Sequence, residues 1–425
     1  MKKNENRKSY ILIALVIITS IAFRKLRYLL YIIQIFFIIF GIKHLIKKTY
    51  KTFWFYRILY FIMIVLSIGW ATSTSSVVSV LPSIVQIILL TLIMCGFIDD
   101  ENKIDKIINI FVYSGIALLI SILIFTPISE WKEIVNFSLN KYIDVSSSAG
   151  RLGPSIGMHS NGLGQTLVLC IMCTTYKYID TKKFKFIFLN ILLLIVMLFV
   201  KSRSSLIEAI LGIFVVFIFS KKYPAKQIIY GFFCLILGAL LIISCIKIPS
   251  LYKIVGYRLE GFVNIFENSN NVDSSTLTRM EFTKIGWDLF KSHPILGVGM
   301  NNFSYLSYNY YHTWAQVYSH NNFIEILSNL GIIGFYLYYY LYLQSFLRLI
   351  KLMKKFKNSN FSNLYSQAAF LFSCLIVLAI MNISHITYET ECVQYMGMLI
   401  ICGSILLNKK YNDVLDNSKG VIEHA

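Results

Sequence analysis

Long runs of apolar residues recur from one end of this 425-residue sequence to the other, and they restrict its possible folds more than any other feature. A helix of about 20 apolar residues crosses the roughly 30 Å hydrocarbon core of a bilayer and satisfies its own backbone hydrogen bonds there. Charged residues make up 14% of the chain, and no polar stretch is long enough for a separate soluble domain. The sequence therefore excludes a soluble globular enzyme and predicts an all-α, polytopic membrane domain over residues 1–425.

About twelve membrane-spanning helices are predicted from these runs, the shorter ones relying on neighbouring helices or local thinning of the bilayer. The first two spans are short, and a single re-entrant hairpin is the alternative for them. The first run follows a basic segment, as in a signal peptide, but no convincing cleavage site follows, so it is interpreted as a span. The predicted spans are 9–23, 28–42, 53–70, 77–97, 107–126, 162–179, 186–200, 204–219, 228–246, 321–343, 364–381 and 393–407.

Basic residues outnumber acidic ones by 40 to 21, and they gather in short segments between the apolar runs. Lys and Arg in short loops are retained in the cytoplasm, so their distribution predicts cytoplasmic N- and C-termini for a multi-pass protein of the cell membrane. The net charge of +19 is thereby explained by topology and by contact with membrane lipids, and no nucleic acid is expected as a partner. The eight cysteines lie almost entirely inside apolar runs, so neither a disulfide framework nor a metal site is predicted.

Two outward segments are too long to be simple connectors: residues 127–160 and, above all, residues 247–320, which precede the last three predicted helices. Loops longer than about 15 residues usually carry function or structure of their own. Apolar residues at helical spacing predict an amphipathic helix in the second segment, beginning at Ser274 and ending before Pro294. The residues that define its face are Leu277, Met280, Lys284, Ile285 and Leu289.

The first candidate for chemistry is KSRSSLIE, in which Arg203 stands between two apolar runs at the predicted outer surface. Ionisable groups at membrane depth are costly and are functional by default. A guanidinium group binds phosphate bidentately and a helix N-terminus adds positive potential, so this position suits a diphosphate. A structural ion pair between Arg203 and Glu208, or an arginine that reaches back to the membrane surface, is the alternative.

The second candidate is RLGPSIGMHSNGLG at 151–164, which offers Arg151, His159 and Asn161 just before a predicted helix. The segment lacks the GK[ST] ending of a phosphate-binding Walker loop, and a plain turn before a helix is an equally good interpretation. Farther along, Arg258 lies in SLYKIVGYRLEGF, where a surface helix is the simpler account.

The third candidate is the amphipathic helix with the aromatic run that follows it. Arg279 would lie on the polar face of that helix. In YLSYNYYHTW at 305–314, side chains such as Tyr311 and Trp314 could stack on sugar rings, although an aromatic belt at the membrane interface is the alternative.

The fourth candidate, SHNNFIEILSNLGIIG, places His320 and Asn321 at the outward start of a membrane helix. After nine further residues come Gly331 and Gly334, which would thin the helix for close packing. An imidazole is the natural general base near neutral pH for removing the proton of an attacking hydroxyl, while a satisfied structural histidine is the alternative.

Four motifs together resemble the Wzy and WaaL superfamily of O-antigen polymerases and ligases. They are the Arg151 to Asn161 segment, the SRSSL around Arg203, the stretch from Arg279 through Trp287 to Gly297 and Gly299, and the His320–Asn321 pair with nine residues before Gly331 and Gly334. The resemblance covers most of the chain, including the helix number and one large outward loop before the last helices. It implies a glycosyltransferase that uses a polyprenyl diphosphate-linked oligosaccharide at the outer face of the cytoplasmic membrane, with neither metal nor cofactor. The loop arginines would bind the diphosphate, and His320 would activate the acceptor hydroxyl, with inversion at the anomeric carbon.

Within the superfamily, Gly334 is followed by Phe335, Tyr336 and Leu337 rather than by the small or hydroxyl residues typical of ligases. This difference favours a polymerase that joins repeat units of capsule, exopolysaccharide or O-antigen. Ligation of glycan to lipid A or another final acceptor is the alternative, and a transporter of lipid-linked sugar is a second one. A transporter would be expected to show internal repeats and charged groups near the bilayer midplane, and neither is found. Whether a chain-length regulator binds is left open.

Overall fold

The computed structural model describes residues 2–26, 32, 50–136, 150–220, 225–263, 274–357 and 361–423, and all regular structure in these ranges is helical. Seven helices within them are long and apolar enough to span a bilayer, so the chain is a membrane protein. The longer helices are α1 (Lys2–Ala22), α3 (Lys51–Leu66), α4 (Thr74–Phe97), α5 (Glu101–Phe125), α7 (Ser160–Thr181), α8 (Lys185–Val200), α9 (Arg203–Phe219), α10 (Ala225–Lys247), α15 (Asn322–Lys357), α16 (Ser362–Ser384) and α17 (Glu391–Glu423).

A helix covers each predicted span except 28–42, which apart from Ile32 lies outside the described residues. The predicted total of twelve spans stays a prediction, because α7 and α9 are not among the seven helices that meet the criteria of length and hydropathy. Nearly every residue of α7 is buried by neighbouring helices. A helix enclosed by protein can carry polar residues such as Gln165 and Thr166, which a lipid-facing helix would not tolerate.

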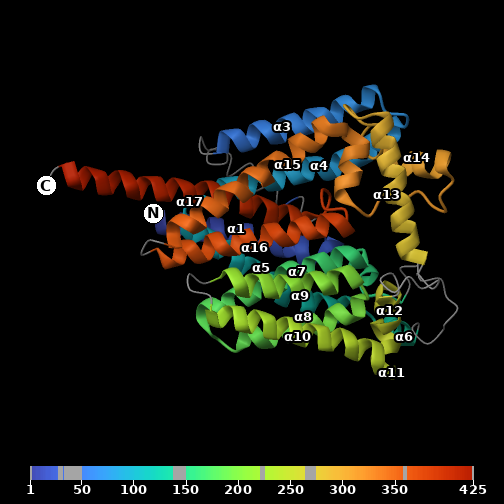
Figure 1. Cartoon of the computed structure of the whole chain (residues 1–425), viewed down its shortest axis with the longest axis horizontal. Coiled ribbons are helices and arrows are strands. Elements are labelled where there is room, and N and C mark those ends of the chain that lie inside the picture. Colours follow the sequence, from blue (N-terminus) through green and yellow to red (C-terminus); the bar gives the residue numbers. More distant parts are fainter. Residues whose placement is uncertain are drawn as a thin grey trace.

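The helices pack side by side into a bundle whose interior and periphery differ in burial (Figure 1). Helices α7, α16 and α17 are enclosed, whereas α10 lies at the edge and is mostly uncovered. The uncovered side chains of α10 are large and apolar, as expected of a face in contact with lipid. They are Ile229, Tyr230, Phe232, Phe233, Ile236, Leu237, Leu240 and Ile243.

The described part of residues 247–320, the segment predicted to face outward, forms a layer across one end of the bundle, at the opposite end from both termini (Figure 1). We call it the outward layer after that prediction. It contains α11 (Pro249–Leu251), η7 (Tyr252–Gly256), α12 (Tyr257–Val263), α13 (Ser274–Ser292) and α14 (Asn302–Tyr311), and the short α6 (Ile128–Asn136) lies nearby. The prediction of a helix from Ser274 to just before Pro294 is confirmed by α13.

Protein covers the predicted apolar face of α13 only in its second half. Leu277 and Met280 are 53% and 61% exposed, whereas Phe282, Ile285 and Leu289 are buried. Phe282 takes the place of Met280 because it packs edge-on against Phe303 of α14. Helical spacing alone does not indicate which of two adjacent apolar stripes a neighbouring helix will cover.

Helix α15 is interrupted at Gly331, whose φ of 61° and ψ of −165° are not helical. The N–H groups of Val298 and Gly299 donate to the carbonyls of Ser328 and Asn329 at 3.0 and 2.9 Å. The turn between α13 and α14 therefore supplies hydrogen bonds to α15 just before its interruption at Gly331. The outward layer is therefore bonded through its backbone to the helix that follows it.

We expect Gly331→Ala to destabilise the protein by several kcal/mol. An added Cβ would lie 2.3 Å from the carbonyl oxygen of Ile295, and the backbone conformation itself costs a non-glycine residue about 1–3 kcal/mol. Thermal unfolding in detergent should show a clear fall in Tm. Gly69→Ala is the matched control, because an added Cβ there meets no atom within 4 Å, and equal Tm values for the two variants would contradict the prediction.

Candidate active site

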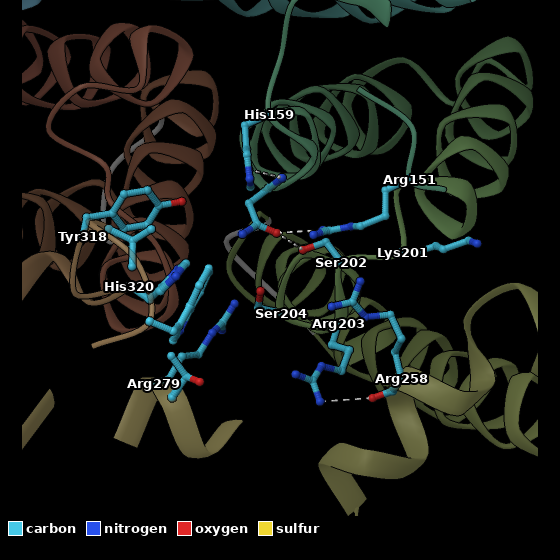
Figure 2. Close-up of a pocket in the computed structure, with 14 residues that line it drawn as sticks. Arg151, His159, Lys201, Ser202, Arg203, Ser204, Arg258, Arg279, Tyr318 and His320 are labelled. Carbon is cyan, nitrogen blue, oxygen red and sulfur yellow. Dashed lines mark hydrogen bonds between the residues drawn. The ribbon is translucent and has the colours of Figure 1, made fainter. Parts of the chain in front are cut away.

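A cavity of about 300 Å³ lies at the end of the bundle covered by the outward layer, where the starts of α7 and α9 meet α12, α13 and the turn before α15 (Figure 2). Its lining holds five Lys or Arg residues and two histidines, and none of its fourteen residues is acidic. We call it the cationic cavity. The residues that line it are Arg151, His159, Asn161, Lys201, Ser202, Arg203, Ser204, Arg258, Thr278, Arg279, Trp314, Val317, Tyr318 and His320.

Most residues singled out in the sequence meet in this cavity, although their segments lie far apart in the chain. They are Arg151, His159, Asn161, Arg203, Arg258, Arg279, Trp314 and His320. Two others do not line it: Tyr311 faces a different cavity, and Asn321 caps α15 by accepting hydrogen bonds from the N–H groups of Phe323 and Ile324. The sequence analysis missed Lys201 and Tyr318, although each stands within two residues of a residue that it selected.

Two glycines shape the turn that leads into α7, and hydrogen bonds fix its polar side chains. Gly153 and Gly157 have positive φ angles, which glycine adopts readily. The guanidinium of Arg151 donates to Asn161 Oδ1 at 2.9 Å and to the carbonyl oxygen of Val200 at 3.2 Å. His159 Nδ1 accepts a hydrogen bond from the backbone N–H of Asn161, so a neutral His159 carries its proton on Nε2 and can donate it.

Burial and, after it, nearby positive charges lower the pKa of two basic residues of the cavity. Burial, followed by the charges of Arg258 and Arg279, lowers the pKa of Arg151 to about 9. Burial, followed by Arg258 and Arg151, lowers the pKa of Lys201 to about 8, and its ammonium donates to the carbonyl oxygen of Ile134 at 2.7 Å. An anion placed among these groups would relieve the repulsion, so the lining is suited to a strongly anionic ligand.

Glu208 and His385 form a buried pair that contacts the cavity lining through Ser204. Glu208 and His385 are each 2% exposed and lie 3.3 Å apart, and Ser384 Oγ also donates to the Glu208 carboxylate at 2.6 Å. His385 Nε2 is also 3.0 Å from Oγ of Ser204, which lines the cavity. Arg203 Nη1 donates to the carbonyl oxygen of Arg258, 3.2 Å away, and so links α9 to α12. No sequence motif pointed to His385.

His320 occupies a tight turn between the outward layer and α15. Its φ of 59° is unusual for a residue other than glycine, and such strain is typical of functional sites. Its ring is nearly parallel to that of Phe282, with centroids 6.2 Å apart, and its buried Nδ1 has no hydrogen-bond partner in the described residues. Burial, followed by the charge of Arg279, lowers the pKa of His320 to about 3. Figure 2 shows His320, Tyr318 and Arg279 across the cavity from Arg151 and Arg258.

Two buried residues of α15 hold this turn in place. Glu325 accepts hydrogen bonds from the backbone N–H of Ser319 at 2.8 Å and from Asn329 Nδ2 at 2.9 Å. Asn322 donates to the hydroxyl of Tyr339 and accepts from the N–H of Thr387, tying the turn to the connection between α16 and α17. The sequence analysis selected Asn321 and overlooked Asn322, the more deeply buried of the two.

We expect Glu325→Gln to cost about 1–3 kcal/mol of stability, because it sets an amide donor against another donor. The Asn329 amide cannot turn over to compensate without losing the hydrogen bond from the Phe303 N–H to its Oδ1. Chemical unfolding in detergent would measure the loss of stability. The exposed Glu281→Gln, in α13, is the control, and similar stability of the two variants would refute this account.

Residues 188–339 match the family model described as O-antigen ligase. The matched stretch runs from α8 into α15 and includes Arg203, Arg258, Arg279 and His320, whereas Arg151 and Asn161 precede it. No curated protein matches the chain.

Proposed function

We propose that this chain, which carries over residues 188–339 a domain of the O-antigen polymerase and ligase superfamily, is a polysaccharide polymerase of the Wzy type. It would transfer glycan from a polyprenyl diphosphate carrier onto the next lipid-linked repeat unit, at the outer face of the cytoplasmic membrane. The observation that carries this proposal is the cationic cavity, in which five Lys or Arg residues and His320 share one space without an acidic residue in the lining.

The cations of the cavity are suited to binding the diphosphate of the glycan donor. As the bond to the anomeric carbon breaks, the polyprenyl diphosphate leaves with a growing negative charge, and preorganised guanidinium groups stabilise that charge in the transition state. Arg151, Arg258 and Arg279 line the cavity from three separate elements, so together they can surround a diphosphate. His159 Nε2–H adds a neutral donor beside them.

His320 is suited to activating the hydroxyl group of the glycan acceptor. Its imidazole would take the proton from the attacking sugar hydroxyl as the new bond to the anomeric carbon forms on the face opposite the leaving diphosphate. The bond between that carbon and the diphosphate oxygen breaks, the electron pair leaves with the diphosphate, and the anomeric configuration inverts. Binding of the anion would raise the pKa of His320 from its depressed value, because it offsets the charge of Arg279.

A ligase is the second candidate, because the matched family model is described as O-antigen ligase. The bulky Phe335, Tyr336 and Leu337 after Gly334 support the polymerase. The two activities differ in the product that accumulates when the enzyme is absent. A polymerase defect leaves single repeat units, whereas a ligase defect leaves long polymer on the lipid carrier.

The deciding experiment measures the size of surface and lipid-linked glycan in a deletion strain complemented with wild type or with His320→Ala. Glycan stalled at one repeat unit in both the deletion strain and the mutant would support the polymerase. Long polymer retained on the carrier would overturn it in favour of the ligase. Normal surface polymer in the deletion strain would refute both.

A further inference from the structure

A second cavity, of about 430 Å³, lies against the other half of α13, and the reaction proposed above does not use it. It opens between the end of α13, helix α14 and the turn that follows η4 (Ser67–Gly69). None of its lining residues is Lys, Arg, Asp or Glu, in contrast to the cationic cavity. We call it the aromatic cavity, after Trp70, Tyr310 and Tyr311 in its lining.

The polar groups of the aromatic cavity come from side chains other than Lys, Arg, Asp and Glu, and they suit the hydroxyl groups of a ligand. Tyr310 and Tyr311 are 64% and 40% exposed, so their rings and hydroxyls are open to a ligand. The indole Nε1 of Trp70 is buried and has no acceptor among the described residues, although buried donors normally find one. His293 Nδ1 is engaged with Ser292 Oγ at 2.9 Å, which leaves its Nε2 for a ligand. Flat aromatic faces beside neutral donors match the C–H faces and hydroxyls of sugar rings.

Hydrogen bonds between its two sides keep the aromatic cavity in shape. Asn302, at the start of α14, accepts from the N–H of Ser73 at 2.7 Å and donates to its carbonyl oxygen at 3.1 Å. The backbone N–H of Met300 donates to Ser67 Oγ at 3.1 Å. Helix α14 is thus bound to the turn that carries Trp70, and a pre-formed pocket loses little entropy when a ligand binds.

The same two segments of the chain contribute residues to both the aromatic and the cationic cavity. Arg279 and Leu289 line the two cavities from the same helix, ten residues apart, which corresponds to about 15 Å along α13. Trp314 and Tyr311, three residues apart, likewise line one cavity each. A glycan whose diphosphate sits among the arginines could therefore extend along α13 to the tyrosines, over a length of a few linked sugar rings.

We propose that the aromatic cavity binds an uncharged saccharide segment of the glycan, several sugar rings away from the diphosphate. The inference rests on the proposed function, because it takes the occupant to be the glycan that the cationic cavity holds at its diphosphate end. Binding there retains the growing chain between successive transfers, so the cavity controls polymer length without taking part in bond formation.

The test uses the full-length His320→Ala protein in detergent, which separates binding from turnover. The probe is a diphosphate-free oligosaccharide of several repeat units prepared from the polymer of the producing strain, and its Kd is measured by titration calorimetry. Tyr310→Ala combined with Tyr311→Ala should weaken binding about tenfold or more, and Trp70→Phe, which removes the N–H donor and part of the aromatic surface but keeps one ring, by less. Tyr308→Ala is the matched control, since Tyr308 is an exposed tyrosine of α14 that does not line the cavity.

In cells with intact His320, the double tyrosine variant should still make polymer but of shorter length, while Tyr308→Ala should give the wild-type length. Equal Kd values in the double variant and the Tyr308 control would overturn the inference. So would binding that depends on Arg279 and not on the tyrosines, since it would place the oligosaccharide in the cationic cavity. Tyrosine-dependent binding alongside normal polymer from the His320→Ala strain would uphold the saccharide site and refute the proposed catalytic function.

Discussion

Replacing His320 with alanine is expected to lower the rate of glycan transfer by about 10²- to 10⁴-fold, the usual contribution of a positioned general base. Folding should be little affected, because the described ring contacts of His320 are packing contacts with Tyr318 and Phe282, and its buried Nδ1 makes no hydrogen bond in the described residues. The measurement is single-turnover transfer with purified protein and lipid-linked substrate. His312→Ala is the control, because His312 is an exposed histidine of the same layer that also has a positive φ.

The pH dependence gives a second signature of His320. A base works in its neutral form, so activity is lost as the pH falls through its pKa. With the pKa at about 3 in the free protein, kcat/KM should show no loss attributable to His320 between about pH 5 and 8. The bound diphosphate raises that pKa, so kcat should fall at a higher pH than kcat/KM does. A His320→Ala protein that keeps this fall in kcat would show that another group is the base.

Arg279→Ala is expected to lower kcat by about 10²- to 10³-fold, as the loss of one preorganised donor to a developing anion typically does. Arg279→Lys should recover only part of the rate, because an ammonium cannot bind phosphate oxygens bidentately. The same change removes the charge that most depresses the pKa of His320. The fall of kcat at acid pH should therefore begin at a higher pH in Arg279→Ala than in the wild type.

Inorganic pyrophosphate provides a readout of Arg279 that does not depend on turnover. An anion that binds only the folded protein raises Tm, and this rise should shrink in Arg279→Ala. Lys284→Ala removes an exposed cation from the same helix and should retain the full rise. Equal rises in the two variants would mean that Arg279 does not contact the diphosphate.

The residues of the cationic cavity were largely predictable because each lies in a local motif with its own chemical reason. Arg203 interrupts apolar runs, and His320 stands at the start of a membrane helix. Residues that act through three-dimensional packing carry no such signal. His385 reaches the cavity wall through Ser204, and it follows α16 without any surrounding motif.

The fold, too, was predictable where the local sequence determines it and not where contacts between distant segments do. Apolar length predicted the positions of the helices, because the bilayer imposes it. It could not predict that Leu277 and Met280 would stay exposed, since that depends on where α14 packs. Gly331 was expected to permit close packing, and it does, but the break in α15 arises from hydrogen bonds to residues far earlier in the chain.

The break in α15 also defines which part of the chain can be exchanged between related proteins. The turn at 294–299 is bonded to the backbone around Gly331, so a chimera cut at the start of α15 would set a foreign turn against a native helix. The natural unit of exchange therefore runs from α13 through the first turns of α15 beyond Gly331. That unit carries Arg279, His320 and both tyrosines of the aromatic cavity, so catalysis and saccharide preference would be inherited together.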